Sequence, residues 1–156
     1  VVGFPHGTVP GRLVADAAAA VVALGATEVD LVVDLGAVAE GAFHQVADDV
    51  ATVRSAVPGV VLKAIVESAL WTPPVLRDVA GAVLDGGADM VKTSTGFHPA
   101  GGATPEAVAE LRSVAGRRAG VKASGGLRTA AAVRAVVLAG ADRLGLSGTR
   151  DVLADW

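Results

Sequence analysis

Apolar segments of two lengths alternate along the chain and predict a βα repetition. The longer segments are alanine-rich and end at glycine or proline, as helices do; they cover residues 12–24, 43–57, 73–84, 104–114 and 129–138. The shorter segments are rich in valine and leucine, which is typical of buried parallel strands; they cover residues 29–33, 60–66, 89–92, 121–123 and 143–146. This alternation favours an α/β fold with a parallel sheet and right-handed crossovers.

A weak internal repeat accompanies these elements. Three six-residue segments, 25–30, 87–92 and 140–145, each begin with Gly-Ala after a predicted helix. The sixth position falls within or at the end of the next strand, which makes Asp30, Lys92 and Gly145 equivalent. In a closed parallel barrel such positions converge, and catalytic groups cluster at the C-terminal strand ends. A chance match is the alternative, because Gly-Ala is common in an alanine-rich chain.

Composition indicates one globular domain. The 156 residues are 52% hydrophobic and carry a net charge of −3, which indicates neither nucleic acid nor a membrane as partner. There is no cysteine, which excludes disulfides and thiolate chemistry. The longest apolar run is too short to span a bilayer, and no signal peptide opens the chain, so we expect a cytoplasmic protein. We find no linker and predict a single domain over residues 1–156.

The lysines are more informative than the overall charge. The chain has ten arginines but only Lys63, Lys92 and Lys122, and each lysine follows apolar residues in a strand-like run. A chain that uses arginine for its exposed cations has therefore placed every lysine where burial is expected. The alternatives are a lysine that extends to the rim of the sheet, or a buried ion pair.

Lys92, Lys122 and Asp30 are the candidate catalytic residues. A nucleophilic lysine needs a pKa well below the ordinary value of about 10.4, through desolvation or a nearby cation. Lys122 lies one βα unit after Lys92 and is placed to supply that cation, and Asp30 is placed to relay protons. This set suits Schiff-base chemistry on a carbonyl. A structural ion-pair cluster would use the same residues.

Glycine-rich turns suggest a phosphate site. Ser124-Gly125-Gly126-Leu127-Arg128-Thr129 follows the strand of Lys122, and Ser147-Gly148-Thr149 follows the last strand. Exposed backbone N–H groups near a helix N-terminus bind phosphate, and the last two loops of parallel barrels often do so. A Gly-Gly pair that only makes a tight turn is the alternative. The predicted substrate is a phosphorylated carbonyl compound.

The remaining polar and aromatic candidates rank lower. The histidines His6, His44 and His98 show no ligand spacing, so we expect no metal. Glu67, at a strand end, is expected either to contact substrate or to pair with Lys63. Both tryptophans are expected to be packing or rim residues.

Two segments resemble the signature sequences of the deoxyribose-phosphate aldolase family. They are Lys92-Thr93-Ser94-Thr95-Gly96-Phe97 and the segment from Lys122 to Thr129. Further segments are similar to that family in its order and at its spacing, namely residues 3–7, 28–30 and 63–67. The resemblance covers essentially the whole chain.

The resemblance implies a class I aldolase on a (β/α)₈ TIM barrel, with no metal or other cofactor. Its reaction reversibly cleaves 2-deoxy-D-ribose 5-phosphate to D-glyceraldehyde 3-phosphate and acetaldehyde. By the same resemblance, Lys92 is the Schiff-base lysine, Lys122 tunes it and assists proton transfer, and Asp30 is the proton relay. The implied phosphate-binding residues are Gly96, Gly125, Gly126, Arg128, Ser147 and Gly148.

The chain also departs from the family pattern. Its first residues are similar to the end of the third barrel strand, so we expect an N-terminally incomplete chain with about strands 3–8. Its last strand ends in Leu146-Ser147-Gly148-Thr149 instead of a serine-rich turn, and it has no tyrosine. Two alternatives stay open: a related lysine aldolase for another phosphorylated or short aldehyde, or an inactive barrel fragment that folds only on association. A homo-oligomer is compatible with the deoxyribose-phosphate aldolase interpretation and with both alternatives.

Overall fold

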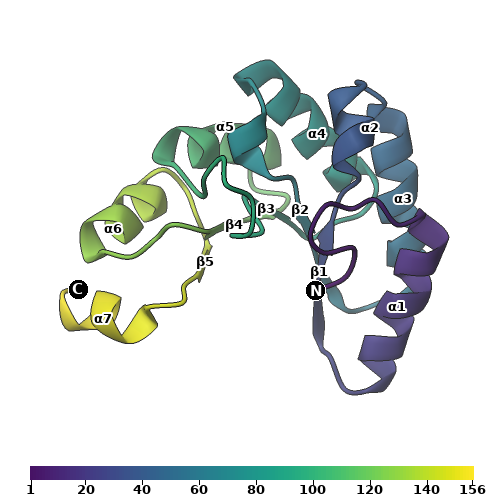
Figure 1. Ribbon diagram of the computed structural model, residues 1–156, viewed down its shortest axis with the longest axis horizontal. Helices are drawn as coiled ribbons and strands as arrows, with labels where there is room; N and C mark the ends of the chain where they lie inside the picture. The colour runs from purple at the N-terminus through teal and green to yellow at the C-terminus, as the bar shows by residue number, and fades with distance from the viewer.

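Five parallel strands form one curled sheet in the computed structural model, which describes residues 1–156. The strands pair in chain order and are β1 (Glu28–Val32), β2 (Val61–Ile65), β3 (Met90–Lys92), β4 (Gly120–Ser124) and β5 (Arg143–Gly145). Figure 1 shows the helices on the outer, convex side of the sheet, with the N-terminus and helix α7 on either side of the open end. The α/β class and the parallel sheet predicted from sequence are confirmed.

All five predicted helices are present, with ends within two residues of the prediction. They are α1 (Gly11–Ala23), α3 (Phe43–Ala56), α4 (Pro73–Asp85), α5 (Pro105–Ala115) and α6 (Ala130–Leu138). Thr104 and Thr129 cap α5 and α6 by accepting from the backbone N–H groups of Ala107 and Ala132. The apolar pattern did not predict α2 (Leu35–Ala39), η1 (Ser68–Leu70) and α7 (Thr149–Ala154), because they are shorter than two helical turns.

The N-terminal segment differs from the expected strand end. Val2 forms only an isolated parallel bridge with Leu31, with its N–H donating to the Asp30 carbonyl at 2.8 Å. Gly3 then takes a φ of 69°, a left-handed conformation that ends strand pairing. The sheet therefore has five strands and one bridged residue, instead of six strands.

Alternation along the strands divides apolar from charged side chains. Val29, Leu31, Leu62, Ala64 and Val91 belong to the apolar core that packs against the helices. Successive strand side chains point to opposite faces, so the residues between them face the concave side. These concave positions include Glu28, Asp30, Lys63, Lys92, Lys122 and Arg143. The sheet thus gathers its charges on the face that the helices leave uncovered.

The internal repeat has a structural cause in two of its three copies. The Arg54 side chain donates to the Gly87 carbonyl at 3.0 Å and pairs with Asp89, and Arg112 does the same with Gly140 and Asp142. Each arginine therefore ties a helix to the loop that starts the next βα unit. In these two copies the repeated glycine and aspartate thus accept the same arginine contact.

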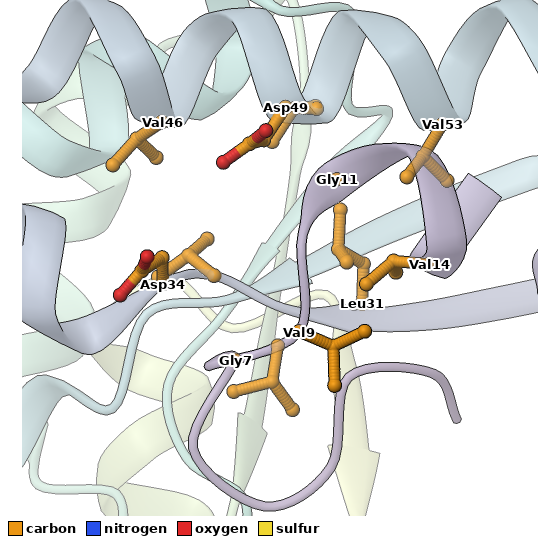
Figure 2. A pocket seen from close by; sticks show the side chains of 12 residues that line it. Gly7, Val9, Gly11, Val14, Leu31, Asp34, Val46, Asp49 and Val53 are labelled. Carbon is orange, nitrogen blue, oxygen red and sulfur yellow. The ribbon is translucent and has the colours of Figure 1, made fainter.

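One small cavity lies between α1, β1 and α3 (Figure 2). It holds about 10 Å³, room for roughly one water, and valine side chains make up much of its wall. Figure 2 shows Asp34 and Asp49 at this cavity, and burial, followed by the charges of Asp34 and Asp48, raises the pKa of Asp49. No lysine reaches it. We assign this cavity to packing, separate from the lysine cluster.

None of the helices is long and apolar enough to cross a membrane.

Candidate active site

All three lysines of the chain converge on the carboxylate of Asp30. Lys63 Nζ lies 2.8 Å from Oδ1, while Lys92 Nζ and Lys122 Nζ lie 2.8 and 2.7 Å from Oδ2. The Lys63 side chain is 4% exposed, and those of Lys92 and Lys122 are 12% and 15% exposed. The expected burial of the lysines is confirmed, and two amines share one carboxylate oxygen.

Strand register explains this convergence. Asp30 pairs directly with Lys63, and Lys92 pairs directly with Lys122, so each pair lies side by side on the concave face. Lys63 pairs with Met90, which places Lys92 two residues further along its strand. A stagger of two residues keeps side chains on the same face and tilts the strands as in a barrel. The equivalence of Asp30 and Lys92 in the repeat therefore holds for the face but not for the register.

A second carboxylate extends the cluster across the sheet. Glu28 Oε2 lies 2.8 Å from Lys63 Nζ and also pairs with Arg143. Glu28 is on the first strand and Arg143 on the last, so the curl of the sheet brings its two edges within side-chain reach. The sequence reasoning did not place Glu28, Lys63 or Arg143 in the site. The alternation of charged and apolar residues along β1 and β2 was the signal that could have found the first two.

The ion pairs shift the protonation equilibria of the cluster. Burial alone would raise the pKa of Asp30, but hydrogen bonds from Lys122, Lys63 and Lys92 outweigh it and hold that pKa well below its usual range. Burial lowers the pKa of Lys122, the hydrogen bond to Asp30 opposes this, and the charge of Lys92 lowers it further. The site therefore combines an ionised carboxylate with an amine that loses its proton more easily than an ordinary lysine.

A polar cavity of about 430 Å³ opens beside Lys92 and Lys122. Of the other residues predicted for the site, Gly96, Gly125, Gly126, Arg128 and Ser147 also line this cavity. Asp30 and Gly148 do not line it, although Asp30 pairs with both lysines that do. The structure thus joins the two lysines to the glycine-rich turns, as the sequence predicts, with Gly148 outside.

The glycine turns approach one another too closely for side chains. A Cβ on Gly125 would lie 3.1 Å from Gly102 Cα and 3.4 Å from Gly96 Cα, and Gly125 has a φ of 85°. A Cβ on Gly102 would lie 2.1 Å from the Gly125 carbonyl oxygen. Backbone contact between these segments therefore sets the shape of the cavity wall.

We expect Gly102→Ala to destabilise the chain by about 1–3 kcal/mol, because the methyl group must displace the Gly125 backbone. The same displacement should weaken the binding of inorganic phosphate. Gly81→Ala is the control, since its Cβ would meet nothing within 4 Å inside helix α4. Thermal unfolding and phosphate titration measure the two effects; equal stability and affinity in the two variants would contradict this packing.

Glu67 does not form the expected pair with Lys63. Its carboxyl group instead accepts from the Thr95 hydroxyl at 2.5 Å and from the Thr95 N–H at 3.2 Å. Trp71 packs against the core and donates its indole N–H to the Val66 carbonyl at 2.7 Å, in agreement with a packing role. No group of three or more His, Asp or Glu side chains is arranged to hold a metal ion.

Chemically, this arrangement offers an amine to a carbonyl and backbone donors to an anion. Lys92 and Lys122 can add to an aldehyde in the cavity. Arg128 and the N–H groups of the glycine turns, which line the same cavity, can bind phosphate. A phosphorylated aldehyde with a few carbons between its two groups would contact both.

Comparisons with known proteins agree with this chemistry. Residues 3–155 match the family model described as DeoC/LacD family aldolase. The chain is 54% identical to the deoxyribose-phosphate aldolase of Mycobacterium avium (strain 104), over 98% of this chain and 70% of that protein. It therefore spans about two thirds of the length of this curated relative.

Solved structures show the same fold. An aldolase called QR15 superposes with a TM-score of 0.91 at 33% identity, covering 98% of this chain and 69% of that one. A deoxyribose phosphate aldolase from Aeropyrum pernix, whose structure is described as a unique tetramer, gives a TM-score of 0.84 at 38% identity over 98% and 64% of the two chains. The curled parallel sheet is therefore an aldolase architecture.

Proposed function

Because the chain belongs to the DeoC/LacD family of aldolases, we propose that it reversibly cleaves 2-deoxy-D-ribose 5-phosphate to D-glyceraldehyde 3-phosphate and acetaldehyde. The observation that carries this proposal is the placement of Lys92 and Lys122 on one oxygen of Asp30, beside a cavity lined by glycine turns. This geometry supplies an amine, a second amine with a lowered pKa and an anion site together.

In the proposed mechanism, the neutral amine of Lys92 adds to C1 of the open-chain sugar, and loss of water leaves a protonated imine. The imine withdraws electrons as the C3 hydroxyl gives up its proton and the C2–C3 bond breaks. This step releases glyceraldehyde 3-phosphate and leaves an enamine on Lys92. A proton returns to C2, and water then hydrolyses the resulting imine to acetaldehyde and free Lys92.

Lys122 and Asp30 are proposed to move the protons in these steps. Lys122 contacts the same Asp30 oxygen as Lys92, and because its pKa is lowered it gives up a proton more easily than an ordinary lysine. Asp30 holds the two amines side by side, so a proton can pass between them without crossing solvent. The resemblance of the signature segments and this geometry support these proposed roles.

The phosphate group is proposed to bind where Gly96, Gly125, Gly126, Arg128 and Ser147 line the cavity, with Gly148 following Ser147 in the chain. Arg128 is exposed at this lining and supplies the positive charge there. Arg128→Gln should raise the KM for 2-deoxyribose 5-phosphate about 10–100-fold, because a charge-assisted hydrogen bond is lost. The KM for unphosphorylated 2-deoxyribose should change little.

The matched control is Arg117→Gln, which removes an exposed arginine outside the cavity lining. Steady-state kinetics on both sugars measure the effect. An Arg128→Gln variant with an unchanged KM for the phosphorylated sugar would contradict the phosphate site. Cleavage rates across a series of sugar phosphates would separate this substrate from those of a related lysine aldolase.

We further propose that the curled five-stranded sheet is part of a (β/α)₈ TIM barrel, about strands 3–8. We also propose that residues 1–156 are a single domain. Support comes from the aldolase superpositions, the Val2–Leu31 bridge at the edge of β1, and the Glu28–Arg143 pair that spans the curl. One continuous apolar core connects the elements. A cytoplasmic location and a homo-oligomeric state stay predictions, the latter in line with the tetramer described for the Aeropyrum protein.

A further inference from the structure

Glu67 is a buried acid that the proposed mechanism does not use. It is 1% exposed, and no lysine or arginine pairs with it. Its backbone φ of 50° makes it the only non-glycine residue with a positive φ. Such a conformation is disfavoured for a residue with a Cβ, and a buried carboxyl group without a cation is costly, so both features point to a specific role.

The backbone around Glu67 is fixed on both sides. The Val66 N–H donates to the Lys92 carbonyl at 3.0 Å, and the Ser68 N–H donates to the Thr93 carbonyl at 2.7 Å. The segment that carries Glu67 is therefore hydrogen-bonded to Lys92, the last residue of β3, and to Thr93, which follows it. The left-handed residue sits between these two hydrogen bonds and cannot easily turn its side chain away.

The carboxyl group of Glu67 forms hydrogen bonds with one residue, Thr95. The Thr95 N–H donates to both carboxyl oxygens, at 3.2 and 3.4 Å, and the Thr95 hydroxyl donates to Oε2 at 2.5 Å. Because the hydroxyl proton is used for Glu67, its oxygen is free to accept, and it accepts from the Phe97 N–H at 3.0 Å. Glu67 thereby sets the direction of hydrogen bonding through the turn.

This turn forms part of the cavity wall. Thr95 and Gly96 both line the cavity beside Lys92, and Phe97, on the far side of Gly96, packs edge-on against Phe4 at 5.6 Å between ring centroids. The hydrogen bonds from Thr95 to Glu67 and from Phe97 to Thr95 thus hold Gly96 from both sides. Gly96 has a φ of 78° and no side chain of its own to fix it.

We propose that Glu67 is a positioning residue that fixes the Thr95–Phe97 turn, through Thr95, in the conformation that binds the substrate phosphate. This inference rests on the proposed function for its catalytic effect. Glu67 does not touch the cavity itself, so its action passes through Thr95. Loss of the Glu67 carboxylate should therefore weaken binding of the substrate phosphate and leave imine formation at Lys92 unchanged.

The test compares Thr95→Val and Glu67→Gln with Thr95→Ser, which keeps the hydroxyl. Thr95→Val should raise the KM for 2-deoxyribose 5-phosphate by on the order of tenfold, because it removes the partly buried hydroxyl that donates to Glu67 and accepts from Phe97. Glu67→Gln should also raise this KM, whereas Thr95→Ser, which keeps the hydroxyl, should leave it close to the wild-type value. For Glu67→Gln, whose side chain does not line the cavity, kcat on unphosphorylated 2-deoxyribose should stay within about threefold of the wild-type value. Thr52→Val, which removes an exposed hydroxyl from α3, controls for the substitution itself.

Amide hydrogen exchange gives a readout that does not depend on turnover. In Glu67→Gln the Thr95 and Phe97 amides should exchange faster, while the Thr93 amide, bonded to the Lys122 carbonyl at 2.9 Å, should not. A wild-type chain that does not cleave the sugar phosphate would refute the proposed function alone, and exchange would still decide the role of Glu67. Unchanged exchange at Thr95 and Phe97, or equal losses on both sugars, would overturn the inference.

Discussion

Replacing Lys92 with arginine should abolish cleavage of 2-deoxyribose 5-phosphate, with a loss on the order of 10⁴-fold or more, as expected when a covalent nucleophile is removed. Arginine keeps the positive charge beside Asp30, but its guanidinium stays protonated and cannot form an imine. The fold should survive because the ion pair is retained. A coupled assay for glyceraldehyde 3-phosphate measures the loss, and circular dichroism reports folding.

Lys92→Met is a second variant for this test. The Lys92 side chain is only 12% exposed, and arginine is larger than lysine, so Lys92→Arg could lose activity through poor fit alone. Methionine removes the amine without adding bulk. Both variants should be inactive and folded. Turnover retained in either of them would mean that the nucleophile lies elsewhere, with Lys122 as the next amine along the cavity.

Asp30→Asn should produce the largest loss of stability, about 3–5 kcal/mol, because one buried and two partly buried ammonium groups lose their common counter-charge. Adding Lys122→Met should recover part of the loss, since Lys122 has no carboxylate partner besides Asp30, whereas Lys63 keeps Glu28. Urea unfolding of the single and double variants measures both effects. A double variant less stable than Asp30→Asn would contradict the interpretation that unpaired charge causes the loss.

The pH dependence of stability gives an independent measure of the same pairs. Because the pKa of Asp30 is lower in the folded chain than in the unfolded chain, its contribution is complete above the unfolded value of about 3.9 and is lost as pH falls below it. Hydrogen bonds from Lys63 and Arg143 also lower the pKa of Glu28. The stability that Glu28 contributes is therefore also lost as the pH falls.

The melting temperature of the wild-type chain should therefore fall as the pH drops from about 4 towards 2, and Asp30→Asn should show a shallower fall over that range. Asp16→Asn, an exposed substitution on α1, is the control and should follow the wild-type slope. Equal slopes in all three chains would show that the Asp30 pairs do not contribute to acid stability.

Local patterns were sufficient to predict the elements and the charged strand ends. The helices and strands follow from apolar periodicity and from capping residues such as Thr104 and Thr129, which act within a few residues of themselves. The burial of the three lysines followed from the apolar residues before each one. These features depend on neighbours in sequence, which a single sequence contains.

Contacts between distant segments could not be predicted in the same way. The Glu28–Arg143 pair joins the first and last strands, and it depends on the curl of the whole sheet. Glu67 was expected either to contact substrate or to pair with Lys63, four residues earlier, but alternation puts these two side chains on the same face only while the strand continues. Because β2 ends at Ile65 and Glu67 turns left-handed, its side chain reaches Thr95 instead.

Borohydride trapping with 2-deoxyribose 5-phosphate, followed by peptide mass spectrometry, tests most directly whether this chain forms a Schiff base at the predicted lysine. The proposed mechanism predicts one reduced adduct on the peptide that contains Lys92, and none on the peptides that contain Lys63 or Lys122. An adduct on Lys122 or Lys63, or no adduct on the folded wild-type chain, would contradict it.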